Sequence, residues 1–271
     1  AAIPQDHSID VTSFPRALLN EITIPEYVAS HHYKVPQGRL DGSAWSLEPA
    51  AVDALMNKVK ERGTELTTFV GAKPYRGIVT GLNDAFLVDT ETKNRLVASG
   101  PSSLGLFHKY LRGQDIGRWA PEWHRLWMIH VPWDCPITQY PSVLRHLELH
   151  RTGLEARPEV QAKRFPWYAM SRYAYDYWHL VAEPKIFYQV IQLYPAYALD
   201  RSGLVSNDKG FFIPSADTWL LAVLNSPLMW WHNWRYLTHM KDEALTPLGV
   251  KMERLPIARP SDEARAEAEQ I

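Results

Sequence analysis

The sequence predicts a globular α+β protein. The chain has 271 residues, of which 46% are hydrophobic and 22% charged. This composition suits a buried core and excludes a disordered, collagen-like or coiled-coil chain. Short β-branched or aromatic runs are concentrated early, and helical patterns are interspersed among them. Because strands and helices do not alternate regularly, a doubly wound parallel sheet is not expected.

The N-terminal region is predicted to be an irregular arm followed by a helix. Residues 1–49 are rich in proline and glycine turn signals. Apolar residues then recur at helical spacing, which predicts a helix over 48–62, with Ser46 as a capping residue and Gly63 as the stop.

The remaining chain is predicted to contain short strands and helices of moderate length in an irregular order. The spacing favours one amphipathic helix over 140–151 and two helical pieces over 219–224 and 228–236. The polar tail, 261–271, has little to bury and is expected to be frayed. Strands are predicted at 67–70, 76–80, 85–89, 126–131, 185–191 and 210–213, with an extended or helical piece at 107–111.

The charge distribution points to the middle of the chain. The net charge is −1, which argues against a protein that coats nucleic acid by charge alone. Residues 108–185 nevertheless carry a net charge of +3 and six of the eleven histidines. A solvated surface with long cationic side chains explains the same excess, so charge alone does not decide the function.

Cellular location is indicated only by weak signals. The sequence contains no apolar run long enough for a membrane span and no visible secretory signal, and Cys135 is its single cysteine. We therefore expect a cytoplasmic protein without a membrane partner. The first residue is Ala1, so an excised fragment is one interpretation.

Common catalytic motifs are absent from the sequence. It lacks the phosphate-binding, dinucleotide-binding, zinc-protease and α/β-hydrolase signatures. His146 and His150 have the spacing that lets two rings face one metal, but no third ligand is placed by spacing, so two polar-face histidines are favoured. We predict no catalytic residues and no metal site.

Two segments have residue types suited to DNA. The turn 77–83 combines glycines with Thr80 and Asn83, which suits phosphate or base-edge contacts, although a plain hairpin would use the same residues. In 109–119, Arg112 or Arg118 could contact guanine and Gln114 adenine. The alternative is that Asp115 pairs with Arg112 or Arg118 to fix a loop.

A third segment interleaves cations with aromatic rings. It runs over 163–168 and is followed by Arg172 and Tyr173. Nucleic-acid surfaces often have this composition, although eleven tryptophans make some such adjacency unsurprising.

Taken in order, these motifs resemble the TaqI-like C-terminal specificity domain. This is the target-recognition domain of type IIG restriction-modification enzymes and related N6-adenine DNA methyltransferases. The similarity covers about residues 20–260. The motifs that carry it are GIVTGLNDAF (77–86), LRGQDI (111–116), the Tyr140 to Arg157 helix, WY (167–168), EPKI (183–186), LNS (224–226) and LPI (255–257), with connector-like pieces at 27–28, 35–37 and 45–47.

The resemblance implies a DNA-recognition module without catalysis. Residues 1–63 would be a connector after an absent methyltransferase domain, and 64–260 the recognition domain. That family's methyltransferase motif, (Asn/Asp)-Pro-Pro-(Tyr/Phe), does not occur here. S-adenosylmethionine is therefore expected only for an N-terminal methyltransferase domain of the same polypeptide, which acts in restriction-modification or phage defence. Whether the intact protein also contains a nuclease stays open at this point.

The expected mechanism is insertion of two loops into a groove of double-stranded DNA. Bases would be read by Thr80, Asn83, Arg112, Gln114 and Arg118, and phosphates would be held by Lys109, Lys163, Arg164, Arg172 and Lys185.

Two alternatives come from the 12% aromatic content. A carbohydrate-binding or glycoside-processing protein would use rings near carboxylates, but the carboxylate separation that a glycosidase needs cannot be read from sequence. A scaffold joining protein partners would also use tryptophan-rich surfaces.

Overall fold

The computed structural model describes residues 7–18, 20–40, 45 and 47–269. The chain divides into two compact units, Ala1–Gly63 and Thr64–Ile271. Within the described residues, no helix is both long and apolar enough to cross a membrane.

The described part of the first unit contains a small antiparallel strand pair, two α-helices and two short 3₁₀ helices. Strand β1 pairs with β2, with Ile9 opposite Val35. Helix α2 confirms the helix predicted over 48–62, whereas Ser46, its expected cap, lies outside the described residues. The elements are β1 (Ser8–Val11), η1 (Arg16–Leu18), α1 (Ile24–His31), β2 (Tyr33–Pro36), η2 (Gln37–Arg39) and α2 (Ala50–Arg62), after which β3 (Gly63–Glu65) follows.

The second unit contains two four-stranded sheets. The first has the strand order β10-β6-β7-β5, and the second β4-β11-β8-β9. Their strands are β4 (Tyr75–Arg76), β5 (Leu87–Val88), β6 (Phe107–Leu111), β7 (Trp127–Ile129), β8 (Lys185–Gln189), β9 (Tyr197–Asp200), β10 (Val205–Ser206) and β11 (Gly210–Ile213). A short hairpin and a further strand complete the set: β12 (Thr238–His239), β13 (Leu245–Thr246) and β14 (Pro256–Ala258).

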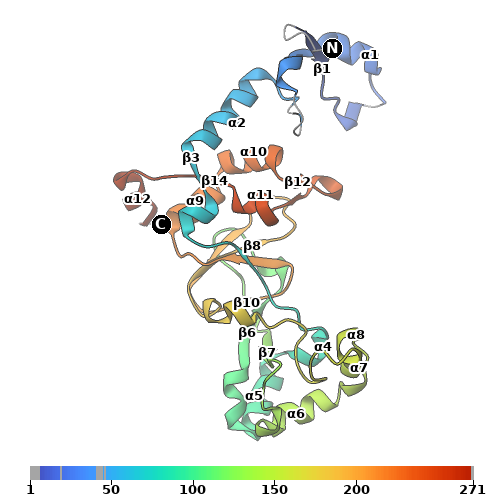
Figure 1. Ribbon diagram of the computed structural model, residues 1–271, viewed down its shortest axis with the longest axis vertical. Helices are drawn as coiled ribbons and strands as arrows, with labels where there is room; N and C mark the ends of the chain where they lie inside the picture. Colours follow the sequence, from blue (N-terminus) through green and yellow to red (C-terminus); the bar gives the residue numbers. More distant parts are fainter. Residues whose placement is uncertain (1–6, 19, 41–44, 46, 270–271) are drawn as a thin grey trace. The chain divides into compact units, whose positions relative to one another are not determined.

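Helices gather around each sheet of this unit. Figure 1 shows α4 to α8 beside β6 and β7, and α9 to α11 beside β8. The helices are α3 (Leu66–Val70), α4 (Asn83–Phe86), α5 (Thr90–Ser99), α6 (Pro141–Glu148), α7 (Arg151–Glu155), α8 (Pro158–Gln161), α9 (Thr218–Leu224), α10 (Pro227–Tyr236), α11 (Gly249–Glu253) and α12 (Asp262–Glu269). Short 3₁₀ helices are η3 (Pro101–Leu106), η4 (Gly113–Asp115), η5 (Ile137–Gln139), η6 (Tyr175–Leu180) and η7 (Lys241–Glu243). This mixture confirms the α+β class predicted from the sequence.

The second sheet lies between two hydrophobic cores, and the side chains of its strands alternate between them. In β8, Phe187 belongs to one core, while Ile186 and Tyr188 belong to the other. Strand β11 repeats the pattern with Phe212 and Ile213. Because successive side chains of a strand point to opposite faces, this sheet is buried on both sides.

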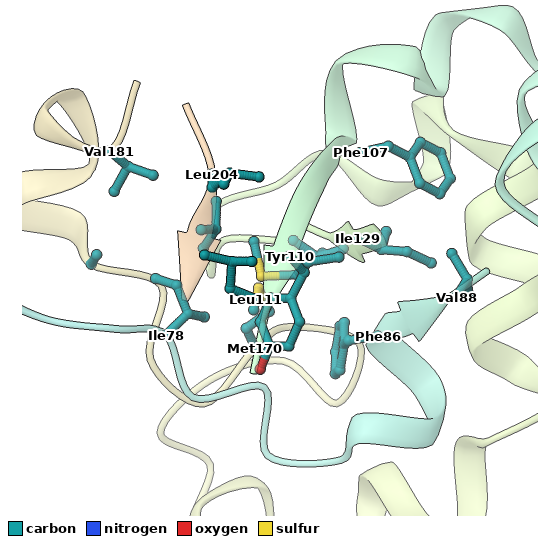
Figure 2. Packing of buried hydrophobic residues seen from close by; sticks show 14 of the residues in the cluster. Ile78, Phe86, Val88, Phe107, Tyr110, Leu111, Ile129, Met170, Val181 and Leu204 are labelled. Atoms are coloured by element: carbon teal, nitrogen blue, oxygen red, sulfur yellow. The ribbon is translucent and has the colours of Figure 1, made fainter. Parts of the chain in front are cut away.

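The first core fills the space around the sheet β10-β6-β7-β5. Figure 2 shows Tyr110, Leu111 and Ile129 packed with Phe86 and Met170, and each of these residues is almost completely buried. The second core lies under α9 to α11. It contains Leu66, Tyr197 and Leu245 among others.

Several sequence predictions of secondary structure are wrong in whole or in part. Within 7–40, predicted as part of an irregular arm, β1, α1 and β2 form, and of 76–80, predicted as a strand, only Arg76 lies in one. Residues 67–70, predicted as a strand, lie in helix α3, which ends where Gly71 adopts a left-handed conformation with φ 79°. Burial of Leu66 outweighs the local β preference of this run. Within 85–89, Ala85 and Phe86 close helix α4, and only Leu87 and Val88 form a strand.

The polar tail forms a regular element for most of its length. Residues 262–269 form helix α12, and Arg265 donates a hydrogen bond of 3.1 Å to Asp217. Residues 270 and 271 lie outside the described part.

Candidate nucleic-acid interface

A cleft of about 810 Å³ opens in the second unit. It is lined by segments that are distant in the sequence, including the end of β4, residues 157–165 and residues 171–177. The cationic and aromatic residues among its walls are Arg76, Trp133, Arg157, Arg164, Phe165, Arg172, Tyr173, Tyr175 and Tyr177.

Two residues of the glycine-containing motif 77–86, Val79 and Gly81, line this cleft. Gly77 and Ile78 donate backbone hydrogen bonds to Gly210 and Ser206, at 2.9 and 2.8 Å. A Cβ at Gly77 would overlap the Asn207 carbonyl, so this strand can approach its neighbour only as glycine. Val79 exchanges two backbone hydrogen bonds with Arg172, at 3.1 and 2.9 Å.

A buried arginine stabilises one wall of the cleft through hydrogen bonds. Arg157 is only 6% exposed, and its guanidinium donates to the carbonyls of Leu154, Ala169 and Trp167. Burial lowers its pKa, although an arginine stays charged. This cation therefore organises the loop around Phe165, whose ring centroid lies 5.3 Å from it.

Two other arginines of the cleft are free to bind a ligand. Arg164 and Arg172 are exposed, and no described residue forms an ion pair or side-chain hydrogen bond with either guanidinium. Arg76 differs, because it donates to the carboxylate of Asp208 at 3.1 Å. Unpaired guanidinium groups in a concave site suit phosphate oxygens, which they can bind through two parallel hydrogen bonds.

Aromatic rings form a continuous row along the cleft. Phe165 stacks on Trp133 with ring centroids 5.1 Å apart, Trp133 meets Tyr173 at 5.6 Å, and Tyr173 meets Tyr175 at 6.0 Å. The two ends of the row differ in exposure, which is 7% at Phe165 and 75% at Tyr175. The outer end thus presents a ring to solvent.

Three carboxylates also line the cleft, from Glu159, Asp176 and Asp208. Asp208 is shared between Arg76 and Lys209, at 3.1 and 3.4 Å. The charge of the cleft is therefore mixed, with unpaired cations on one side and acceptor oxygens beside them.

The structure corrects the role predicted for Thr80. Its side chain is 4% exposed and donates to Asn83 Oδ1 at 2.6 Å, so it is not available to read a base. Asn83 is exposed, but the same bond ties its side-chain oxygen to Thr80. The motif predicted to enter a groove acts instead as the scaffold of the cleft.

The loop after β6 lies outside the cleft lining. Arg112 forms a fork with Asp115, with Nε and Nη2 each within 3.2 Å of a carboxylate oxygen, so the pairing considered as the alternative is present. Arg118 donates to the Asn225 carbonyl at 2.8 Å and lies over the Trp119 ring. Gln114 is exposed, and none of the described residues binds its side chain.

A turn connects this loop with the cleft. Asn207 donates its backbone N–H to the Leu111 carbonyl, and a Cβ at Gly113 would lie 2.8 Å from Lys209 Cβ. Asp208, between these two residues, lines the cleft. Exposed Lys209 and the Arg112 loop therefore continue the surface that begins at the cleft.

The lysines predicted to contact phosphates are dispersed. Lys163 lies in a neighbouring groove that shares Arg164 with the cleft. Lys109 faces a separate hollow with Arg201, where its ammonium group lies 4.8 Å from the centroid of the Trp123 ring.

The prediction that Lys185 contacts phosphates is wrong. Its side chain is fully buried and donates to Asp200 Oδ2 at 2.9 Å. Burial lowers the pKa of Lys185, and the hydrogen bond that Lys185 donates to Asp200 opposes this shift. Lys185 therefore stabilises the fold and is not available to a phosphate.

Sequence reasoning singled out Tyr173 beside Arg172 but missed Arg76, Trp133 and Tyr175 as members of the site. Arg76 directly precedes the glycine motif, and Tyr175 follows Arg172 at a spacing of three residues. A search for rings next to the predicted phosphate residues could have found Tyr175. Trp133 is brought in by the fold alone.

His146 on α6 and His150, which lies between α6 and α7, show no metal arrangement. His146 Nε2 lies 3.0 Å from the Ala85 carbonyl, and its ring is 5.3 Å from that of His150. Within the described part of the chain, no group of three or more His, Cys, Asp or Glu side chains could hold a metal ion.

No protein-family model matches the sequence, and no curated protein matches it either. Among solved structures, the chain is similar to the Type IIL restriction-modification enzyme MmeI, which was solved in complex with DNA. The TM-score is 0.50 with 15% sequence identity, over 73% of this chain. The chain spans about a quarter of that enzyme's length, since the match covers 26% of it. The similarity therefore shows a fold shared with part of a restriction-modification enzyme.

Proposed function

We propose that this chain is the double-stranded DNA recognition module of a restriction-modification enzyme and performs no catalysis by itself. The observation that carries the proposal is the cleft, where unpaired Arg164 and Arg172 lie beside a row of aromatic rings that ends at the exposed Tyr175. The MmeI structure, which contains DNA, supports the same function through the shared fold.

The finer proposal concerns the intact protein. By the resemblance of its motifs, the chain belongs with type IIG enzymes that methylate adenine at N6 and act in phage defence in the cytoplasm. A methyltransferase domain N-terminal to this chain in the same polypeptide would bind S-adenosylmethionine. A nuclease activity of the intact protein is compatible with this assignment.

The division of roles follows from which side chains have partners. Arg164 and Arg172 would bind phosphates, with Lys163 and Lys209 extending the cationic surface. Gln114 would contact a base edge, because its side chain is exposed and no described residue binds it. Phosphate contacts give affinity that depends on salt, whereas base contacts give sequence preference.

The double variant Arg164→Ala/Arg172→Ala tests this proposal. Its affinity for duplex DNA should fall about 100-fold, and the slope of log K against log salt should decrease by about 2, since each lost phosphate contact removes about 0.9. Fluorescence anisotropy over a salt series, with a duplex obtained by selection from random sequences, measures both.

The matched control is Arg95→Ala/Arg145→Ala. It removes the same charge from exposed positions on α5 and α6 that do not line the cleft. Equal loss in the two double variants would show that only net charge matters. The proposed function is wrong if the 271-residue chain does not bind duplex DNA with an affinity that falls as the salt concentration rises.

A further inference from the structure

Tyr175 has an unusual position for a large aromatic residue. Its ring is 75% exposed at the mouth of the cleft, although an ordinary packed tyrosine would bury most of its surface. Among the described residues, Tyr173 is the aromatic residue that contacts this ring, in an edge-to-face arrangement. Its outer part is therefore available to another flat group.

The backbone that carries Tyr175 is strained. Ala174 adopts φ 59° and ψ 41°, a left-handed conformation that costs a residue with a Cβ about 1 kcal/mol. Ala174 is itself 7% exposed and belongs to the first core, which fixes the conformation. Strain of this kind persists where packing enforces it and is concentrated at binding sites.

The charges around the ring select the kind of ligand. A purely anionic ligand would meet Asp176 and Glu159 as well as the arginines. A nucleotide fits this mixture better, because it combines an uncharged base with a phosphate. The base would lie on the rings near the carboxylates, which can accept its amino protons, while Arg164 and Arg172 bind the phosphates.

We propose that the cleft receives one unstacked nucleotide of the bound DNA, with its base stacked on Tyr175. This inference rests on the proposed function and adds that recognition requires a local opening of the base stack. In an intact duplex both faces of an internal base are covered by its neighbours. A ring can therefore stack on such a base only after the step has been unstacked.

The preference for a preformed unstacked base provides a direct test. Unstacking costs least where a base has no pairing partner. The 271-residue chain should therefore bind a short duplex with a single-nucleotide bulge about tenfold more tightly than the matched duplex of the same sequence. Fluorescence anisotropy at one salt concentration measures the ratio.

Variants of Tyr175 assign the effect to its ring. Tyr175→Ala should remove most of the bulge preference, because stacking of one base on an aromatic side chain is worth about tenfold in affinity. Tyr175→Phe should retain it. Tyr194→Ala is the matched control, since Tyr194 is 54% exposed and does not line the cleft.

The outcomes separate this inference from the proposed function. Binding of duplex DNA without a bulge preference, or an unchanged preference in Tyr175→Ala, overturns the unstacked nucleotide while leaving DNA recognition intact. Absence of salt-dependent binding to every DNA overturns both proposals. Thermal unfolding of each variant confirms that the exposed substitution leaves the fold unchanged.

Discussion

The cations of the basic central segment fall into two groups that the sequence does not separate. Lys185 and Arg157 are buried and satisfied by a carboxylate or by carbonyl groups. Arg164 and Arg172 are exposed in the cleft without a described partner. The comparison shows that the position of a cation in a basic segment does not indicate its role. A cation with a buried partner stabilises the fold, whereas an exposed cation without a described partner can bind a ligand.

The comparison is tested most strongly at Lys185. Lys185→Ala should lower the free energy of unfolding by about 3–5 kcal/mol, because it leaves the Asp200 carboxylate buried without its cation. Urea unfolding measures this loss. Asp200 also accepts backbone hydrogen bonds from Ser202 and Leu204, which the substitution leaves in place.

Exposed Lys209 provides the control for this experiment. Its ion pair with Asp208 is 3.4 Å long and the lysine side chain is 66% exposed, so Lys209→Ala should change stability by less than about 1 kcal/mol. The double variant Lys185→Met/Asp200→Asn should recover part of the loss, since it removes the unpaired charge. Similar costs at Lys185 and Lys209 would contradict the division into two groups.

A buried histidine, His130, forms a third case, because it is buried but one of its ring nitrogens lacks a hydrogen-bond partner among the described residues. His130 is 8% exposed, stacks on Trp178 with centroids 3.6 Å apart, and its Nε2 atom has no hydrogen-bond partner. Burial, with a contribution from His108, lowers the pKa of His130 to about 3. In the folded protein this ring is therefore neutral at pH 7.

Stability should fall on acidification because the unfolded chain binds the proton more readily. The pKa of His130 is lowered on folding, so its contribution is complete above about pH 6.5 and is lost as the pH falls towards 3. Between pH 7 and pH 5 the loss is about 2 kcal/mol. His130→Phe, which retains a ring for Trp178, should reduce the pH dependence of urea unfolding by that amount.

Exposed His179 supplies a matched His-to-Phe control, His179→Phe, measured in the same urea series. An identical acid response in wild type and His130→Phe would show that His130 is protonated in the folded protein without cost. His108, His146 and His232, whose pKa values are also lowered by burial, contribute to the acid response that remains.

Local patterns in the sequence predicted most of the fold but only part of the site. The helix over 48–62 and the strands around 186 and 212 follow from apolar periodicity and turn residues, which act over short distances. The run 67–70 could not be assigned correctly, because burial of Leu66 against distant residues decides its conformation. Lys185 was predicted to contact DNA because the sequence shows that it is a cation. The sequence does not show that this cation pairs with the Asp200 carboxylate.

The same limit explains the outcome for the glycine motif. The sequence indicated correctly that the backbone at Gly77 approaches another group closely. It did not indicate that this group is the Asn207 carbonyl of the protein itself. Arg164 and Arg172 were identified from composition, whereas Tyr175 became a candidate only when its exposure was known.

The smallest expected effect distinguishes a paired from an unpaired polar residue in one loop. The Arg112 fork is committed to Asp115, whose side chain is 3% exposed, so Arg112→Ala should lower stability by about 1 kcal/mol and leave sequence preference unchanged. Gln114 has no described partner, so Gln114→Ala should leave stability unchanged. It should relax preference at one base pair by about 1–3 kcal/mol.

Selection from random duplexes with each variant measures the preference, and urea unfolding measures the stability. The two substitutions lie two residues apart on η4 and its flank, so any general disturbance of the loop would affect both alike. Loss of sequence preference in Arg112→Ala alone would mean that the guanidinium leaves Asp115 when DNA binds. In that case the ion pair would be a resting position of a base-reading arginine, and pairing in the free protein would no longer exclude a role in recognition.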